Sequence, residues 1–155
     1  MSEEFLTYKS SGVDVDINNE ANERIKAHVK RTHNRSVLTE PGLFGGGVSL
    51  TDFKGLKQPV LAGALGFQSG NYRAESAVRE IIRDCNRKLQ PEAERIAFLD
   101  YIAAAKLDPA RVEAIVGRFA DLLSGSLKIP IIGGETAEMP GSFHKTAWEV
   151  MGALY

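Results

Sequence analysis

Short apolar segments alternate with amphipathic segments along this chain, and that alternation restricts the fold to a sheet with helices packed on it. Strands that alternate with helices indicate an α/β or α+β fold. We therefore expect a small, mostly antiparallel or mixed sheet with helices on one face. The apolar segments have the composition of strands and span residues 59–67, 96–105, 128–134 and 147–155.

Three segments carry apolar residues at helical spacing, and two of them have clear signals for their starts. Asn18 or Asn19 is the expected N-cap of the first helix. Asp108 is the expected cap of the third, with Pro109 in its first position. We expect the three helices to span residues 18–33, 75–89 and 109–125.

Composition and charge exclude several classes of protein. A length of 155 residues fits one domain. The net charge of -1 gives no general attraction to nucleic acid or to an acidic membrane surface, and no apolar run approaches the roughly 20 residues of a membrane-spanning helix. Cys85 is the only cysteine, so no intrachain disulfide can form, which suits a reducing cytoplasm. We expect a cytoplasmic protein whose partners are neither nucleic acid nor membrane.

Residues 129–141, IPIIGGETAEMPG, join a strand to two glycines and two carboxylates. Gly133 and Gly134 allow a sharp turn and close approach to a ligand. If the chain turns helically after them, Glu135 and Glu138 share one face, where paired carboxylates can hold Mg²⁺ against phosphate. The alternative is a glycine turn followed by the solvated first turn of a helix.

Three segments, in one order and at domain-scale spacing, together resemble a known family. They are YKSSGVDVDINNEANERIKAHVKRT near the start, FLDYIAAAKLDP in the middle and IIGGETAEMPG near the end. From Tyr8 to about Leu154, the chain resembles the N-terminal domain of aminoimidazole ribonucleotide synthetase, the PurM family of phosphoribosylformylglycinamidine cyclo-ligases.

The resemblance implies a fold and a chemistry. Such domains carry a small mixed sheet with helices on its outer side, two protomers pair their sheets into a barrel, and a second domain follows. The implied reaction belongs to purine biosynthesis and closes the imidazole ring of formylglycinamidine ribonucleotide: ATP phosphorylates a formamide oxygen, an amine of the same substrate attacks, and phosphate leaves. ATP and Mg²⁺ are implied near the subunit interface. We therefore expect a homodimer that binds nucleotide.

The resemblance also assigns candidate site residues. It places Lys9 in a mobile segment close to ATP, and Glu135 at a carboxylate position close to metal or phosphate. Simpler alternatives are a solvated terminal Lys9 and a flexible connection at residues 44–45. Asp100, in FLDY, either points into the site or pairs with a residue of a neighbouring strand, and we favour the structural role. The nucleotide-binding candidates are Lys9, Asp14, Asp16, Phe44, Gly45, Asn86, Arg87, Gly133 and Gly134, and the metal candidate is Glu135.

Two segments depart from the family pattern. The family's acidic, glycine-rich T-D-G-V-G-T-K segment corresponds here to AGALGFQSGNYRAES, which contains neither Asp nor Lys. The family's Asn-Asp pair corresponds to Asn86 and Arg87, so a fixed cation replaces a metal ligand. Asp84 is expected to face elsewhere on that helix. Arg87 can bind phosphate without Mg²⁺, but it cannot bridge phosphate oxygens as a metal does.

Three functions are compatible with these features. The first is an ATP-site and dimerisation domain of a cyclo-ligase, residues 18–155, behind a mobile segment 1–17 and working with a C-terminal domain absent from this chain. The second is a non-catalytic dimerisation or nucleotide-binding module that has lost its metal site. The third is a sister branch that phosphorylates another poor nucleophile, which GGETAEMPG and FLDY disfavour. The altered metal motif predicts that the isolated chain is inactive.

Overall fold

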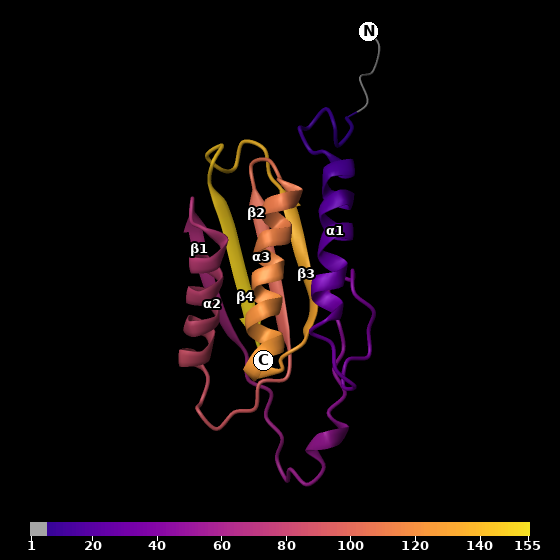
Figure 1. The fold of residues 1–155 in the computed structure, drawn as a ribbon, viewed down its shortest axis with the longest axis vertical. Helices are drawn as coiled ribbons and strands as arrows, with labels where there is room; N and C mark the ends of the chain where they lie inside the picture. The colour runs from indigo at the N-terminus through magenta and orange to yellow at the C-terminus, as the bar shows by residue number, and fades with distance from the viewer. Residues whose placement is uncertain (1–5) are drawn as a thin grey trace.

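The computed structural model describes residues 6–155, which form one four-stranded sheet and three long helices (Figure 1). None of the helices in this part of the chain is long and apolar enough to cross a membrane. Two short helical turns, η1 (Thr51–Phe53) and η2 (Leu123–Leu127), lie between the main elements. Those elements are α1 (Val15–Lys30), β1 (Ala64–Gly70), α2 (Ala74–Lys88), β2 (Phe98–Ala104), α3 (Pro109–Leu122), β3 (Ile131–Glu138) and β4 (Trp148–Leu154).

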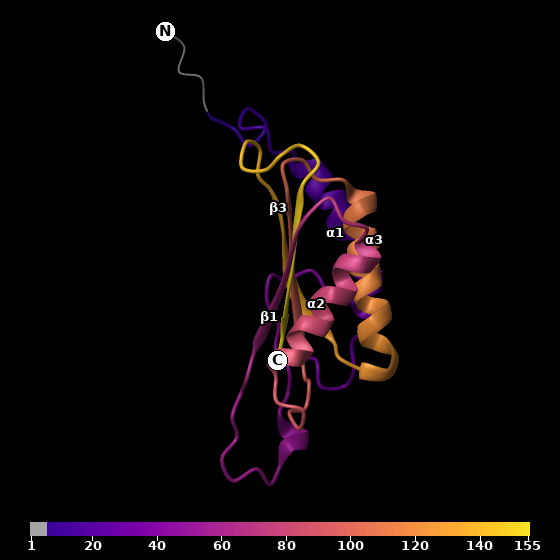
Figure 2. The ribbon, with the colours of Figure 1, turned by 90° about the vertical axis from the view of Figure 1, so that its left-hand side faces the viewer.

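The sheet is mixed and has the strand order β1-β4-β2-β3. β4 runs antiparallel to both of its neighbours, whereas β2 and the edge strand β3 run parallel. Seen edge-on, the three long helices lie on one face of the sheet, and no described helix covers the other face (Figure 2). The predicted mixed sheet with helices on one face is therefore confirmed.

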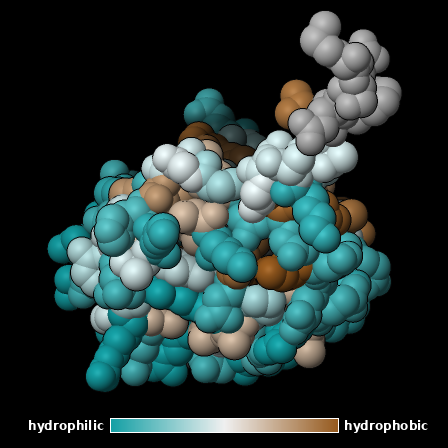
Figure 3. Space-filling view, turned by 90° about the horizontal axis from the view of Figure 1, so that it is seen from above, coloured by the Kyte–Doolittle hydropathy of each residue, from teal (hydrophilic) through white to brown (hydrophobic). Residues whose placement is uncertain are grey.

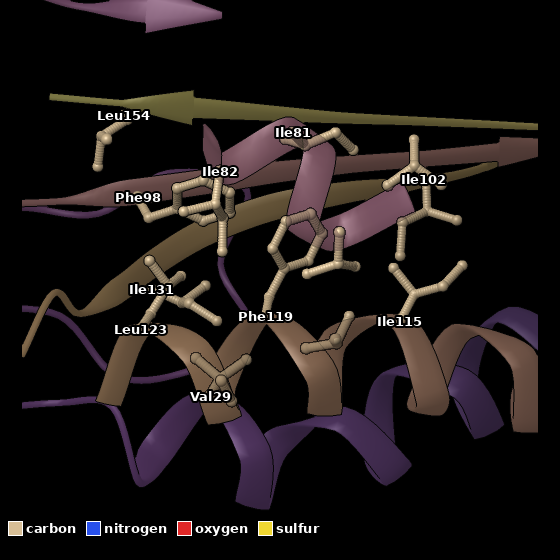
Figure 4. Packing of buried hydrophobic residues seen from close by; sticks show 14 of the residues in the cluster. Val29, Ile81, Ile82, Phe98, Ile102, Ile115, Phe119, Leu123, Ile131 and Leu154 are labelled. Atoms are coloured by element: carbon tan, nitrogen blue, oxygen red, sulfur yellow. The ribbon is translucent and has the colours of Figure 1, made fainter. Parts of the chain in front are cut away.

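The hydrophobic core lies between the helices and the sheet. Ile81 of α2, Phe119 of α3 and Phe98 of β2 are fully buried there (Figure 4). The rings of Phe98 and Phe119 pack in a tilted arrangement, with centroids 4.9 Å apart and an interplanar angle of 46°. Complete burial of such a side chain contributes roughly 1.5–3 kcal/mol. The apolar residues at helical spacing in α2 and α3 thus face the sheet, as their pattern predicted.

The start of α3 follows the predicted capping. Asp108 Oδ1 accepts a hydrogen bond from the Ala110 amide at 3.0 Å, and Pro109 is the first helical residue. The proline lacks the amide hydrogen that would have no partner at this position, so it costs no hydrogen bond. This end of the helix was therefore specified by local sequence alone.

The start of α1 differs from the prediction. Asp14 is the N-cap, because its Oδ1 accepts hydrogen bonds from the amides of Asp16 and Ile17 at 3.1 and 3.3 Å. Asn18 and Asn19 therefore lie inside the helix, and the predicted cap at those residues is wrong. The helix also ends at Lys30, three residues before the expected His33.

Two strands also differ from their predicted ranges. β1 begins at Ala64, five residues later than predicted, and Val60 in the preceding apolar run is 86% exposed. β3 does not stop at its glycines: Gly133 and Gly134 pair with Leu99 and Asp100 of β2, and the strand continues to Glu138. The predicted glycine turn is wrong, because regular pairing with β2 keeps this backbone extended.

Candidate functional site

A cavity of about 270 Å³ lies where α1, the loop of residues 41–44 and β3 meet. Ile25 and Val29 provide its apolar wall. Its polar lining comes from three elements that are far apart in sequence. These polar residues are Asn18, Asn19, Asn22 and Lys26 of α1, Asp100 of β2, and Glu135 and Thr136 of β3.

Glycines bring the 41–47 loop against β3. A Cβ atom on Gly133 would lie 2.7 Å from Gly45 Cα, and one on Gly46 would lie 2.1 Å from the Ile132 carbonyl oxygen. No larger residue fits either position without moving backbone. Phe44 and Gly133, both predicted site residues, thus share this cavity, and Gly45 touches Gly133 at its wall. The glycines serve strand-to-loop packing instead of the predicted turn.

Asp100 is the residue that sequence reasoning placed in the wrong role. Its Oδ2 is buried and has no hydrogen-bond partner among the described residues, so the expected pairing with a neighbouring strand is wrong. Burial raises the pKa of Asp100 from 3.8 to about 7. A Cβ on Gly134 would lie 1.9 Å from Asp100 Oδ1, so the neighbouring glycine makes room for the carboxyl group. An aspartate inside the otherwise apolar run FLDYIAAA was the available signal.

Asn18 contributes a second buried acceptor to this cavity. Its Oδ1 is also buried and lacks a hydrogen-bond partner among the described residues. A buried polar atom without a partner costs roughly 1–3 kcal/mol. Lys26, the cation of the lining, donates to Glu23 Oε1, so its charge is already paired. The lysine of the lining therefore leaves the two buried acceptors without a partner.

Glu135 and Glu138 do not form the predicted pair. Residues three apart in a strand point to opposite faces, so the expectation of one shared helical face is wrong. Glu135 is exposed and lines the cavity. Glu138 instead joins two segments, because its Oε2 accepts from the Asp14 amide at 2.6 Å and its Oε1 accepts from the Leu107 amide at 2.9 Å. Glu138 is thus a structural carboxylate.

The predicted N-terminal site residues lie outside the cavity lining. Lys9 is exposed in a turn in which its carbonyl accepts from the Gly12 amide at 3.1 Å. Asp14 caps α1, and Asp16 is exposed in its first turn. Figure 3 looks down on this end of the molecule, where hydrophilic side chains predominate around smaller hydrophobic areas.

The predicted residues of α2 also lie away from this cavity. α2 packs over β1 and β4, near the edge of the sheet opposite to β3. Asn86 Oδ1 accepts from Arg95 Nε at 3.1 Å, which fixes the loop after α2. Arg87 forms an ion pair with Asp84 at 3.2 Å. The expectation that Asp84 faces elsewhere is wrong, because residues three apart on a helix are neighbours.

The stretch that the resemblance sets against the family's acidic segment forms β1 and a tight connection to α2. Arg111 holds this connection: its Nη1 donates to Asn71 Oδ1 at 3.3 Å and its Nη2 donates to the Tyr72 carbonyl at 3.1 Å. The guanidinium also lies 4.7 Å from the Trp148 ring centroid, a cation–π contact. The space left between these groups is only about 10 Å³. The connection is closed by the chain's own side chains.

These residues do not fit a Mg²⁺ site. Among residues 6–155, no three His, Cys, Asp or Glu side chains lie close enough together to hold a metal ion. Glu135 lies on β3 while Arg87 and its partner Asp84 lie on α2, across the sheet. Magnesium prefers an octahedron of oxygens, which this arrangement does not supply.

The fold of this chain resembles that of two solved structures. It matches Escherichia coli HypE with a TM-score of 0.55 at 12% identity, covering 88% of this chain and 42% of that one. It matches thiamine-monophosphate kinase from Stenotrophomonas maltophilia with a TM-score of 0.50 at 14% identity, covering 87% and 41%. At these identities the likeness shows the fold alone.

Sequence relatives identify the branch. The chain is 37% identical over 153 residues to phosphoribosylformylglycinamidine cyclo-ligase of Brevibacillus brevis, and 36% identical over 158 residues to that of Shouchella clausii. Each match covers 94% of this chain and 44% of the relative, so the chain spans less than half the length of these relatives. No protein-family model matches it. The predicted resemblance is confirmed: the chain is a homologue of the amino-terminal part of these cyclo-ligases.

Proposed function

We propose that this chain is an aminoimidazole ribonucleotide synthetase-like domain that contributes a substrate cavity and a dimer surface to ATP-dependent ring closure in purine biosynthesis. The observation that carries the proposal is identity of 36–37% to cyclo-ligases over 94% of the chain. We assign residues 18–155, together with the first turn of α1, to one domain of the enzyme. A further domain would supply the rest of the reaction.

The geometry supports a role in holding the substrate. The cavity is lined by Asn18 of α1 and Asp100 of β2, each with a buried acceptor that lacks a partner among the described residues. Ring closure needs two groups of one flexible molecule to be held in contact, which is a matter of positioning and water exclusion. A concave cavity with a few polar groups suits that task. ATP is the proposed phosphoryl donor, by analogy with the cyclo-ligase relatives, and no step through Mg²⁺ is assigned to this chain.

A homodimer belongs to the same proposal. On the face of the sheet without helices, β1 exposes 56% of Leu65 and 47% of Phe67. Phe67 aligns across the sheet with Met151 of β4 and Tyr101 of β2, which extends the apolar row. Covering such a face with a second copy removes apolar surface from water. We propose that two sheets pair in this way, in the cytoplasm.

A second function is favoured by the β1 side of the molecule. There, Arg87 stands where the resemblance expects an aspartate, and the connection after β1 is closed by Arg111 and Trp148. These features support a non-catalytic dimerisation or nucleotide-binding module, since a fixed cation stands where the resemblance expects a metal ligand and the fold is intact.

A chimera separates the two functions. The matched amino-terminal part of the Brevibacillus brevis cyclo-ligase is replaced by this chain, and ATP-dependent ring closure and dimerisation are both measured. We expect ring closure that is lower than in the parent enzyme but lost on Asp100→Ala. A folded, dimeric chimera without ring closure would instead assign the chain to the non-catalytic module.

Calorimetry with ATP, in the presence and absence of Mg²⁺, provides the second measurement on the unmodified chain. Binding that does not depend on the metal agrees with the residues described above. Magnesium-dependent binding would show that the chain builds a metal site in its dimer that one copy does not contain.

A further inference from the structure

Glu138, the last residue of β3, holds two distant segments with one carboxyl group. Its Oε2 accepts a hydrogen bond from the Asp14 amide at 2.6 Å, and its Oε1 accepts one from the Leu107 amide at 2.9 Å. Both partners are donors, and an ionised carboxylate accepts at both of its oxygens. A glutamine would place an NH2 group against one of these amides, so the pair of contacts requires a carboxylate.

Both amides belong to the starts of helices. Asp14 is the N-cap of α1, and Leu107 directly precedes Asp108, the N-cap of α3. Figure 2 shows the starts of α1 and α3 at the same end of the sheet. The amino-terminal end of a helix carries partial positive charge, which favours a nearby carboxylate. Glu138 thus ties the starts of two helices to the end of one strand.

The segment before α1 is a compact turn that rests on the chain just after Glu138. Within this turn the Gly12 amide donates to the Lys9 carbonyl at 3.1 Å. Gly12 has a φ of +84°, and a Cβ atom there would lie 3.1 Å from Pro140 Cγ. Residues 7–14 are therefore anchored twice, by a hydrogen bond to Glu138 and by packing on Pro140.

The same anchor reaches the cavity through the first turn of α1. The Asn18 amide donates to the Asp14 carbonyl at 3.2 Å, and the Asn18 side chain lines the cavity. Because hydrogen bonds of this kind make a helical turn move as one unit, a displacement of Asp14 also displaces Asn18. The position of the cavity wall thus depends on a carboxyl group that does not line the cavity.

We propose that Glu138 is a positioning residue for ring closure, an inference that rests on the proposed function. It fixes the start of α1, which keeps Asn18 at the cavity, and it keeps Lys9 within an anchored turn. Through Leu107 it also fixes the start of α3, so one side chain sets how three elements meet.

Limited trypsin digestion of the full 155-residue chain tests the anchor without any activity. Lys9 lies in the anchored turn, and Lys57 lies exposed outside the helices and strands. In the wild type we expect cleavage after Lys9 to be at least about tenfold slower than cleavage after Lys57, because anchored backbone must open before it is cut. Glu138→Ala should raise the rate at Lys9 by about tenfold and leave the rate at Lys57 unchanged.

Two results of the digestion overturn the anchor. One is equal cleavage at Lys9 and Lys57 in the wild type, and the other is a Lys9 rate that does not respond to Glu138→Ala. Glu138→Gln retains one acceptor and carries the same test if Glu138→Ala does not fold.

Kinetics of the chimera described above test the positioning role. On the proposed function Asn18 holds the substrate before and during the reaction alike, so its displacement raises KM and leaves kcat nearly unchanged. We expect Glu138→Gln to raise the KM for formylglycinamidine ribonucleotide by at least about tenfold, with kcat within about twofold of the parent chimera. Glu75→Gln is the matched control, since Glu75 joins α2 to α3 by accepting from Arg118 at 2.9 Å and does not line the cavity.

The outcomes separate this role from the proposed function. An unchanged KM in Glu138→Gln, or an equal rise in Glu75→Gln, makes Glu138 a purely structural residue and defeats the positioning role alone. A chimera without ring closure defeats the ligase function and with it the positioning role, while the digestion rates still decide whether Glu138 anchors the segment before α1.

Discussion

The two edges of the sheet, at β1 and at β3, differ in how far they match the cyclo-ligase pattern that the sequence led us to expect. At the β3 side, the loop of residues 41–47 packs on Gly133, and a cavity remains open around Asp100. At the β1 side, Arg111 and Trp148 close the connection to α2, and Arg87 pairs with Asp84. The edge at β3 thus borders a cavity of about 270 Å³, whereas about 10 Å³ remains between the side chains at the edge at β1.

The two edges of the sheet depend on different contacts, so a change at one need not affect the other. The core side chains of α2 and α3 hold the sheet on both sides. Exposed charges such as Arg87 contribute little to stability, so they can change without unfolding the chain. The glycines and the buried carboxyl of the β3 side, in contrast, are constrained by close packing.

Gly133→Val should give the largest effect. The added side chain meets the backbone of Gly45 at 2.7 Å, and backbone cannot rotate away. We expect a loss of about 3 kcal/mol in the free energy of unfolding, measured by urea denaturation. Gly47→Ala is the control, since a Cβ there meets only the Leu38 side chain, at 3.7 Å. Equal stability of the two variants would show that the loop does not pack on β3.

Asp100→Asn should remove the part of the pH dependence of stability that comes from Asp100. Because the folded-state pKa is about 7 and the ordinary value is 3.8, the unfolded chain loses this proton first as the pH rises. The wild-type stability contribution is therefore full below about pH 4 and is lost between pH 4 and 7. At pH 8 we expect Asp100→Asn to be more stable than wild type by about 4 kcal/mol, and at pH 4 to match it closely. Thermal unfolding at both pH values checks the crossover, and a constant difference between them would contradict the burial of Asp100.

Asp84→Asn provides the comparison from the other side of the sheet. Hydrogen bonds from Lys88 and Arg87 lower the pKa of Asp84, so its contribution is present above its ordinary pKa and is lost as the pH falls. The pH dependence of this variant should thus have the opposite sign to that of Asp100→Asn, and a smaller size because the group is exposed.

Phe67→Lys tests the uncovered face of the sheet. Phe67 is 47% exposed in one copy, and a lysine there would place a charge within the paired sheets. We expect the dissociation constant of the dimer to rise by at least about tenfold, measured by sedimentation equilibrium. Lys57→Glu, an exposed change outside the sheet, should leave the dimer intact. A wild-type chain that sediments as a monomer contradicts the pairing itself.

Arg87→Asp should have the smallest effect. The variant places an acidic residue where the resemblance expects the Asp of the Asn-Asp pair. However, α2 packs near the β1 edge of the sheet and the cavity lies at the β3 edge. We expect no shift of the thermal midpoint on addition of Mg²⁺ for either the variant or the wild type. A rise specific to the variant would mean that a second copy brings Glu135 close to α2.

The sequence by itself determined the elements that depend on neighbours along the chain. Helical spacing placed α2 and α3, and the Asp108-Pro109 pair set the start of α3. Three segments with distinctive motifs also indicated the family. Local hydrogen bonds and periodicity follow from adjacent residues, so a reading along the chain can find them.

Only the tertiary structure decided what Gly133, Asp100 and Glu138 do. Gly133 contacts a loop almost ninety residues earlier in the chain, and Glu138 reaches the Asp14 amide at the start of α1. Whether a carboxyl group is buried or paired depends on which distant segments cover it, and desolvation by those segments sets its pKa. For that reason the fold was predictable from the sequence, but the roles of the residues in the cavity were not.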